Sequence, residues 1–126
     1  MVDDYRAAAI RHIKDAQALA AGGRYDNAGH LIGFGAECLL KQKLRSLRNE
    51  PQANYDGHHP DPQRRVRREL EYRRLSGPWL AIMRKTTIFQ DWHISDRYSA
   101  DGVVTKEKYD TWEKVTMNLL SISKIR

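Results

Sequence analysis

The segment from Gly22 to Leu44, GGRYDNAGHLIGFGAECLLKQKL, limits the possible folds of this chain more than any other part. Its middle, residues 28–40, is apolar or small except for two side chains, His30 and Glu37. A helix of this composition is apolar around most of its circumference, so it must pack against neighbours on most sides. We therefore expect a central helix that begins near residue 25 and ends about residue 48.

Helical periodicity and helix-boundary signals predict further helices around this one. A glycine pair ends the first helix, Asp61-Pro62 begins the third and Ser76-Gly77-Pro78 precedes the fourth. The expected helices span about residues 3–21, 25–48, 62–75, 78–89 and 105–125. The predicted fold is therefore all-α, an up-and-down bundle of four to five helices in which residues 1–126 form one domain. Its core is expected to come from the first, second and last helices.

Three glycines lie inside the expected central helix, at positions 29, 33 and 35. Each costs about 1 kcal/mol relative to alanine in a helix interior. Such a cost is usually offset where a glycine lets another backbone come close. The glycines therefore predict either tight packing within the chain or a symmetric dimer.

One face of the same helix carries polar residues at spacings of three and four. Asp26, His30, Gly33, Glu37 and Lys41 share this face, which we call the polar seam. The seam is expected to be either a solvent-exposed strip or a buried polar network.

The chain carries a net charge of +6, and its pI is about 9.6. A basic surface favours polyanions such as RNA or DNA, or an acidic protein, as partners.

Cys38 is the single cysteine, so no intrachain disulfide can form. We expect it to be a buried apolar residue of a protein in a reducing compartment. The charged amino-terminal segment does not resemble a signal peptide, and no apolar run is long enough for a membrane span. We expect a cytoplasmic protein with no membrane association.

The third expected helix holds six arginines within eleven residues. Arginine binds phosphate with two parallel hydrogen bonds, so this helix is the best candidate surface for nucleic acid or an acidic partner. The alternative is a solvated face whose charge is offset by Glu69 and Glu71. The six candidates are Arg64, Arg65, Arg67, Arg68, Arg73 and Arg74, which we call the arginine strip.

Glu37 and Arg97 form a candidate structural pair. Glu37 lies between Ala36 and Cys38 in an apolar run, so its carboxylate needs a partner, and we expect Arg97 to supply it. The alternative is that both are unrelated surface charges. Trp92 lies outside a clear helix and is expected to pack at a dimer interface or to cover Arg97.

The histidines have structural and chemical interpretations. A lone histidine such as His30 is more often a hydrogen-bonded structural residue than a general base or metal ligand. His58, His59 and His93 have no cysteine or carboxylate at zinc-ligand spacing, so we expect neither a metal site nor a cofactor.

Two stretches resemble the HEPN family of small bacterial and archaeal helical domains. The first is GRYDNAGHLIGFGAECLLKQKL, with Glu37 followed by Leu39, Leu40 and Lys41; the second is the pair Arg97-Tyr98 before the last helix. His58 lies roughly where many members carry a histidine. The resemblance implies a helical bundle that forms a homodimer and acts in a toxin–antitoxin or anti-phage setting, often beside a nucleotidyltransferase.

The active members of that family are metal-independent ribonucleases with an arginine followed, four to six residues later, by a histidine. After Arg97 these positions hold Gly102, Val103 and Val104. The spacing recurs from Arg24 to His30, but at the start of the second helix. The resemblance therefore implies first a non-catalytic module that binds RNA or a partner protein. The alternatives are a ribonuclease that uses Arg24, His30 or Arg97, and an interaction subunit that binds an acidic partner through its basic helix.

Overall fold

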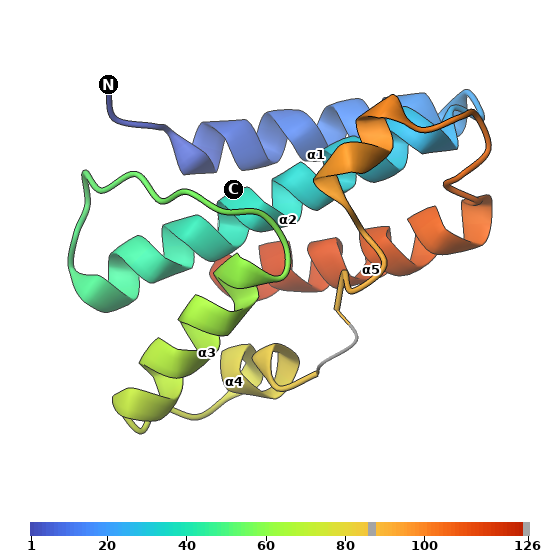
Figure 1. The fold of residues 1–126 in the computed structure, drawn as a ribbon. Coiled ribbons are helices and arrows are strands. Elements are labelled where there is room, and N and C mark those ends of the chain that lie inside the picture. Colours follow the sequence, from blue (N-terminus) through green and yellow to red (C-terminus); the bar gives the residue numbers. More distant parts are fainter. Residues whose placement is uncertain (86–87, 125–126) are drawn as a thin grey trace.

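A computed structural model describes residues 1–85 and 88–124 of the chain. Within these ranges the protein is all-helical and has no β-strand, so the predicted all-α bundle is confirmed. Figure 1 shows α1 and α2 packed side by side, α5 across α2, and α3 and α4 at one end of the bundle. The helices are α1 (Tyr5–Ala21), α2 (Tyr25–Arg48), α3 (Asp61–Tyr72), α4 (Pro78–Met83) and α5 (Lys106–Ser123), with a short 3-10 helix, η1 (Ile94–Tyr98), before α5.

Helices α1 and α2 form an antiparallel hairpin, as the short glycine link predicts. The Asp4 side chain caps α1 by accepting a hydrogen bond from the Ala7 N–H at 2.9 Å. Gly23 ends the turn with φ of 76°, a left-handed conformation that glycine adopts without steric cost. The buried face of α1 contains Tyr5, Ala9, Ile13 and Ala16, which follow one another at spacings of three and four residues.

The three glycines of α2 face other parts of the same chain. A Cβ at Gly29 would lie 2.7 Å from Val104 Cγ1, and one at Gly35 would lie 2.8 Å from Ile13 Cγ1. A Cβ at Gly33 would overlap the indole of Trp92. Close packing within the chain therefore accounts for the glycines, and this pattern does not require a second copy.

The chain between α3 and η1 differs from the prediction. Helix α3 ends at Tyr72 instead of residue 75, and α4 ends at Met83. Ile88 and Phe89 lie in a turn, so the expected continuation of α4 is wrong at these two positions; residues 86–87 lie outside the described ranges. Phe89 has φ of 52° and is buried against His59, with ring centroids 4.4 Å apart. This packing turns the chain back toward α2.

Trp92 belongs to the core, which corrects the expectation of a dimer-interface or Arg97-covering residue. It is 2% exposed, and its indole N–H donates to the Gly29 carbonyl at 3.0 Å. The flat indole occupies the space that the missing side chain of Gly33 leaves. A tryptophan in a connecting segment is thus a principal packing partner of α2.

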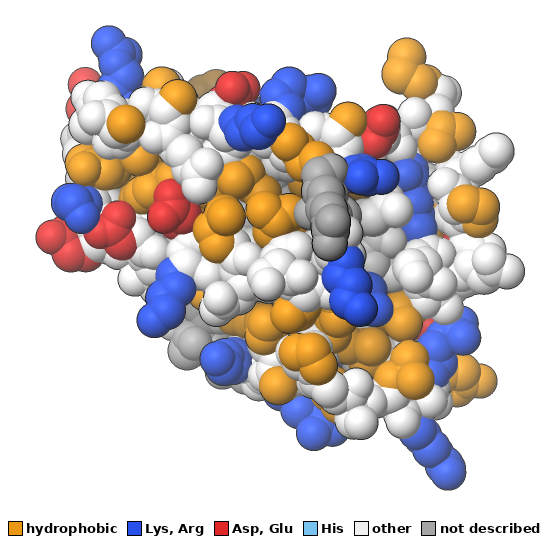
Figure 2. Space-filling model, turned by 180° about the vertical axis from the view of Figure 1, so that it is seen from behind, with side chains coloured by type: hydrophobic (Ala, Val, Ile, Leu, Met, Phe, Trp, Pro, Cys, Tyr) orange, Lys and Arg blue, Asp and Glu red, His pale blue; other side chains and the backbone are white. Residues whose placement is uncertain are grey.

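Figure 2 shows that Lys and Arg side chains are spread over the face seen from behind, among patches of hydrophobic side chains. The basic composition therefore appears on the surface without forming a single block in this view. No helix in the described part of the chain is both long and apolar enough to cross a bilayer.

Candidate functional site

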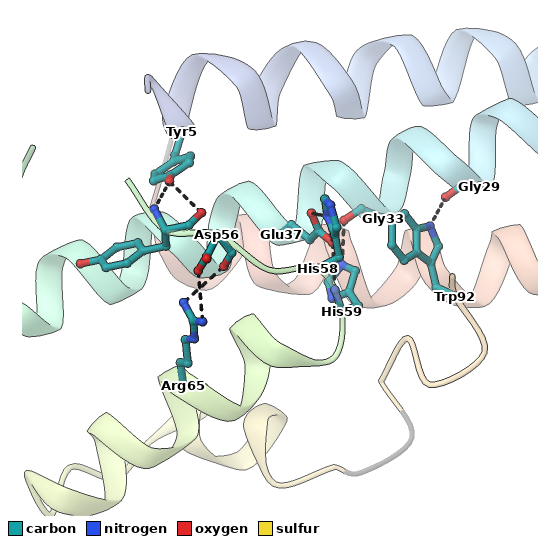
Figure 3. Close-up of polar contacts among 10 residues, drawn as sticks. Tyr5, Gly29, Gly33, Glu37, Asp56, His58, His59, Arg65 and Trp92 are labelled. Carbon is teal, nitrogen blue, oxygen red and sulfur yellow. Dashed lines mark hydrogen bonds and ion pairs between the residues drawn. The ribbon is translucent and has the colours of Figure 1, made fainter. Parts of the chain in front are cut away.

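Glu37 lies at the centre of the candidate site, on the buried side of α2. The residue is 3% exposed, and one carboxylate oxygen accepts a hydrogen bond from the His59 backbone N–H at 2.9 Å. The other oxygen lies 3.0 Å from Nδ1 of His58 (Figure 3). The expected Glu37–Arg97 pair is therefore wrong, because the loop before α3 supplies both partners of the carboxylate.

The contact between Glu37 and His58 has the form of a carboxylate–histidine dyad. When Glu37 is ionised, Nδ1 of His58 carries a hydrogen and donates a hydrogen bond to the carboxylate. Burial raises the pKa of Glu37, while the hydrogen bonds from His58 and His59 and the charge of Lys41 act in the opposite direction. The His58 side chain is 45% exposed, and Nε2 has no partner among the described residues. That nitrogen is free to form a hydrogen bond with a ligand.

His30 lies near this dyad, in an aromatic setting. Its ring stacks on Trp92 at 5.3 Å between centroids and meets the edge of Phe34 at 4.7 Å. Its Nε2 is buried and has no hydrogen-bond partner within the described part of the chain. Burial lowers the pKa of His30, and the positive charge of Arg97 lowers it further. His30 is therefore held in its neutral form.

The structure brings Arg97, but not Arg24, into the neighbourhood of His30. Arg97 lies in η1, which packs against α2, and its guanidinium is exposed above the ring of Tyr98 at 4.9 Å. Its charge, like that of His58, is close enough to affect the ionisation of His30. Arg24 is the N-cap residue of α2. Six residues correspond to about 600° of helical rotation, so Arg24 and His30 lie on different sides of α2.

His59 has a structural role, despite its position next to His58. Its Nε2 donates to the Gly33 carbonyl at 2.7 Å, and its ring stacks on Phe89. Burial lowers the pKa of His59 to about 4. The imidazole is therefore neutral at physiological pH and fixes the loop to the α2 backbone.

The loop that carries His58 is fixed at further points. The Tyr55 backbone N–H donates to the hydroxyl of Tyr5 at 2.7 Å, which ties the loop to α1. Asp56 contacts the guanidinium of Arg65 at 3.3 Å, which ties it to α3 (Figure 3). His58 is thus presented by a loop that is held on three helices.

Carboxylates neutralise most of the arginine strip. Four of its arginines pair with acidic residues: Arg64 with Asp61, Arg65 with Asp56, Arg67 with Glu71 and Arg73 with Glu69. Arg68 and Arg74 are exposed and have no carboxylate partner in the described ranges. Between them lies Tyr72, whose residue surface is 85% exposed. The unpaired charge of the strip is therefore concentrated at the carboxyl end of α3.

No group of three or more His, Cys, Asp or Glu side chains among the described residues is arranged to hold a metal ion. His93 is exposed at the start of η1, and no metal-ligand set forms around the histidine pair of the loop. The chemistry that the site offers is proton transfer by imidazole and attraction of an anion by Arg97.

Comparisons of the chain with protein-family models, curated proteins and solved structures gave no match.

The contact between Glu37 and His58 was not predicted from the sequence, although two signals pointed to it. A carboxylate in an apolar run needs partners, and the HEPN resemblance had singled out the position of His58. The sequence does not show the path of the loop before α3, and this path brings His58 to Glu37.

Proposed function

We propose that the protein is a HEPN-like module that binds single-stranded RNA through the carboxyl end of α3. The observation that carries this proposal is the pair of exposed arginines without a carboxylate partner among the described residues, Arg68 and Arg74, which precede and follow the exposed Tyr72 in the sequence. Arg68 and Tyr72 are four residues apart and so lie on one face of the helix. Guanidinium groups bind phosphates, and an exposed aromatic ring supplies a surface on which a base stacks.

The paired arginines of the strip add to this surface. Exposed ion pairs such as Arg64–Asp61 contribute about 0–1 kcal/mol, so a phosphate competes with the carboxylate at little cost. The biological setting follows from the HEPN resemblance, which implies a homodimer in a toxin–antitoxin or defence system. An acidic protein, including a nucleotidyltransferase-type partner, is the competing ligand for the same strip.

The test is fluorescence anisotropy with a labelled 20-nucleotide RNA over a series of salt concentrations. Loss of two phosphate contacts in an Arg68→Ala/Arg74→Ala variant should reduce the slope of log K against log salt by about 1.4. Tyr72→Ala should weaken binding by about 1–3 kcal/mol with little change in slope. Lys114→Ala, an exposed position on α5, is the control. Binding that does not depend on salt, or on these three residues, would reject the proposal, and binding of polyglutamate without RNA binding would favour an acidic protein partner.

A second candidate function is metal-independent RNA cleavage, and the Glu37–His58 dyad near His30 and Arg97 favours it. In this mechanism Nε2 of His58 takes the proton of the RNA 2′-hydroxyl, while Glu37 holds the ring in the required tautomer. The oxygen attacks the neighbouring phosphorus, and Arg97 stabilises the charge that develops on the phosphorane. The bond from phosphorus to the 5′-oxygen breaks, and the 5′-oxygen takes a proton from solvent water while His58 releases its own proton to the solvent. The products carry a 2′,3′-cyclic phosphate and a 5′-hydroxyl.

Incubation of RNA with the protein in EDTA tests this candidate. Cleavage should fall by about 10²-fold or more in His58→Gln and in Arg97→Ala. Arg24→Ala is the matched control, because Arg24 lies on another side of α2 and should leave cleavage unchanged. Absence of cleavage by the wild-type protein would exclude the enzyme and leave the binding proposal intact.

A further inference from the structure

A pocket of about 430 Å³ lies between the carboxyl-terminal half of α2, the tryptophan of α4 and the end of α5. It shares no lining residue with the histidine site or with the arginine strip. Its volume is within the range of about 300–1,000 Å³ that is typical of small-molecule sites. Neither the RNA-binding proposal nor the cleavage mechanism uses it.

The pocket has an apolar wall. Leu39 and Trp79 are buried members of the core, and Ile122 is half-buried at the edge. These three side chains come from α2, α4 and α5, so the wall depends on the packing of three helices. A flat indole beside two aliphatic side chains suits an aromatic ring or a short aliphatic chain.

The polar lining is cationic. Lys43 and Lys124 both line the pocket, together with Gln42 and Ser46, and the lining contains no acidic residue. Lys43 is half-buried and forms no ion pair with a described residue; its ammonium lies 5.1 Å from the centre of the Trp79 ring. Burial lowers the pKa of Lys43, because its ammonium group loses contact with water. An anionic group would supply the missing countercharge.

Lys124 is placed at the pocket by the end of α5. It is the C-cap residue, and its φ of 58° puts it in the left-handed conformation that ends many helices. Its backbone N–H donates to the Ser121 carbonyl, and Ser123 Oγ donates to the Leu120 carbonyl. Two of the terminal carbonyls thus already have donors, which reduces their repulsion of an anion.

We propose that this pocket binds a small organic anion. Its carboxylate or phosphate group contacts Lys43 and Lys124, and its apolar part packs on Trp79 and Leu39. The combination of two lysines, no acid and an apolar wall distinguishes this ligand class from RNA, whose backbone needs a continuous track of charge. The site is independent of the proposed functions of α3 and of the histidines.

Titrations followed by tryptophan fluorescence test the proposal. The probes are octanoate and phenyl phosphate, which separate a carboxylate from a phosphate ligand, with neutral octanamide as the charge control. Saturable binding of at least one anion is expected, with octanamide at least about tenfold weaker, since hydrogen bonds to charged groups are worth roughly tenfold or more. Trp79→Phe should remove most of the fluorescence change and identify its origin.

Two variants test the lysines separately. Lys43→Met keeps the apolar stem, and Lys124→Asn keeps a residue that tolerates the left-handed conformation. Each should weaken anion binding about tenfold, while Lys114→Ala on the exposed face of α5 should not. The proposal fails if none of the anions saturates the protein below about 10 mM, if octanamide binds as well as octanoate, or if neither lysine variant changes binding. Should Lys43→Met not fold, Lys124→Asn alone decides.

Discussion

Replacement of Gly33 by alanine tests the packing on which the candidate site is built. The new methyl group would overlap Nε1 and Cε2 of Trp92 and would lie 2.8 Å from its Cδ1. The indole cannot bend, and it is enclosed by the rings of His30, Phe34 and His59. The tryptophan must therefore shift as a whole, which breaks its hydrogen bond to the Gly29 carbonyl.

The expected loss can be worked from these contacts. A buried hydrogen bond left unmade costs about 1–3 kcal/mol, and each displaced aromatic pair costs about 0.5–1.5 kcal/mol. The higher helix propensity of alanine returns about 1 kcal/mol. With mid-range values, and with one or two of the three aromatic pairs lost, the net destabilisation is about 2–3 kcal/mol. For a chain of 126 residues this corresponds to a decrease in Tm of about 10 °C.

Thermal and urea denaturation followed by circular dichroism measure this loss. Gly22→Ala is the matched control, since a Cβ there would meet only backbone oxygens, the nearer at 3.6 Å, and Gly22 has φ of −90°. Its stability should change by less than about 0.5 kcal/mol. In a Trp92→Leu background the cost of Gly33→Ala should shrink by more than about 1 kcal/mol. A Gly33→Ala protein as stable as the wild type would refute the reasoning.

Three further predictions concern the buried groups of His59 and Glu37 and the half-buried thiol of Cys38, which was expected to be buried. His59 is neutral in the fold, and its pKa is lowered from 6.5 to about 4. The contribution of this group to the free energy of unfolding is therefore fully present above pH 6.5 and is lost as the pH falls through about 4. Urea denaturation at pH 7 and pH 4 should show that this group lowers the free energy of unfolding by about 3 kcal/mol at the lower pH, and His59→Phe should lack this decrease. Equal pH profiles of the wild type and His59→Phe would contradict the prediction. Glu37→Leu should destabilise by about 3 kcal/mol, since it leaves the His59 N–H without an acceptor, whereas Glu37→Gln should lose less in the same assay. Burial raises the pKa of Cys38 from 9.0 to about 11, so Ellman's reagent should react about 100-fold more slowly with native than with unfolded protein at pH 8, and similar rates would show an open thiol.

Helix positions were predictable because each helix carries its own periodic signal. The apolar stripe of α5 and the small-residue face of α2 placed both helices to within a few residues. The last residue expected in α5, Ile125, lies outside the described ranges. The end of α4 was not predictable, because the position of Phe89 depends on His59, thirty residues away in the sequence. Local propensity carries no information about such a partner.

The candidate site was predictable in its composition but not in its pairing. The burial of Glu37 follows from its apolar neighbours, which is why a partner was expected at all. The choice of Arg97 rested on opposite charge alone. In the structure a backbone N–H and a half-exposed imidazole satisfy the carboxylate, and both come from a loop that has no periodic pattern. A backbone donor leaves no signature in the side chains of a sequence.

The polar seam of α2 explains why two long connections are held at neighbouring places on this helix. Asp26 accepts hydrogen bonds from the Gly102 and Val104 N–H groups, at 2.8 and 2.9 Å, and so holds the segment after η1. The Gly33 carbonyl and Glu37 hold the loop before α3. The seam thus supplies hydrogen-bond acceptors to these two connections, as a polar network and not as a solvent-exposed strip. His58 and Arg97 come from those two connections, so their proximity to His30 is a consequence of how the loops are held on α2. A substitution at Asp26 should therefore displace the segment after η1, on the side of Arg97, whereas one at Glu37 should displace the loop that carries His58.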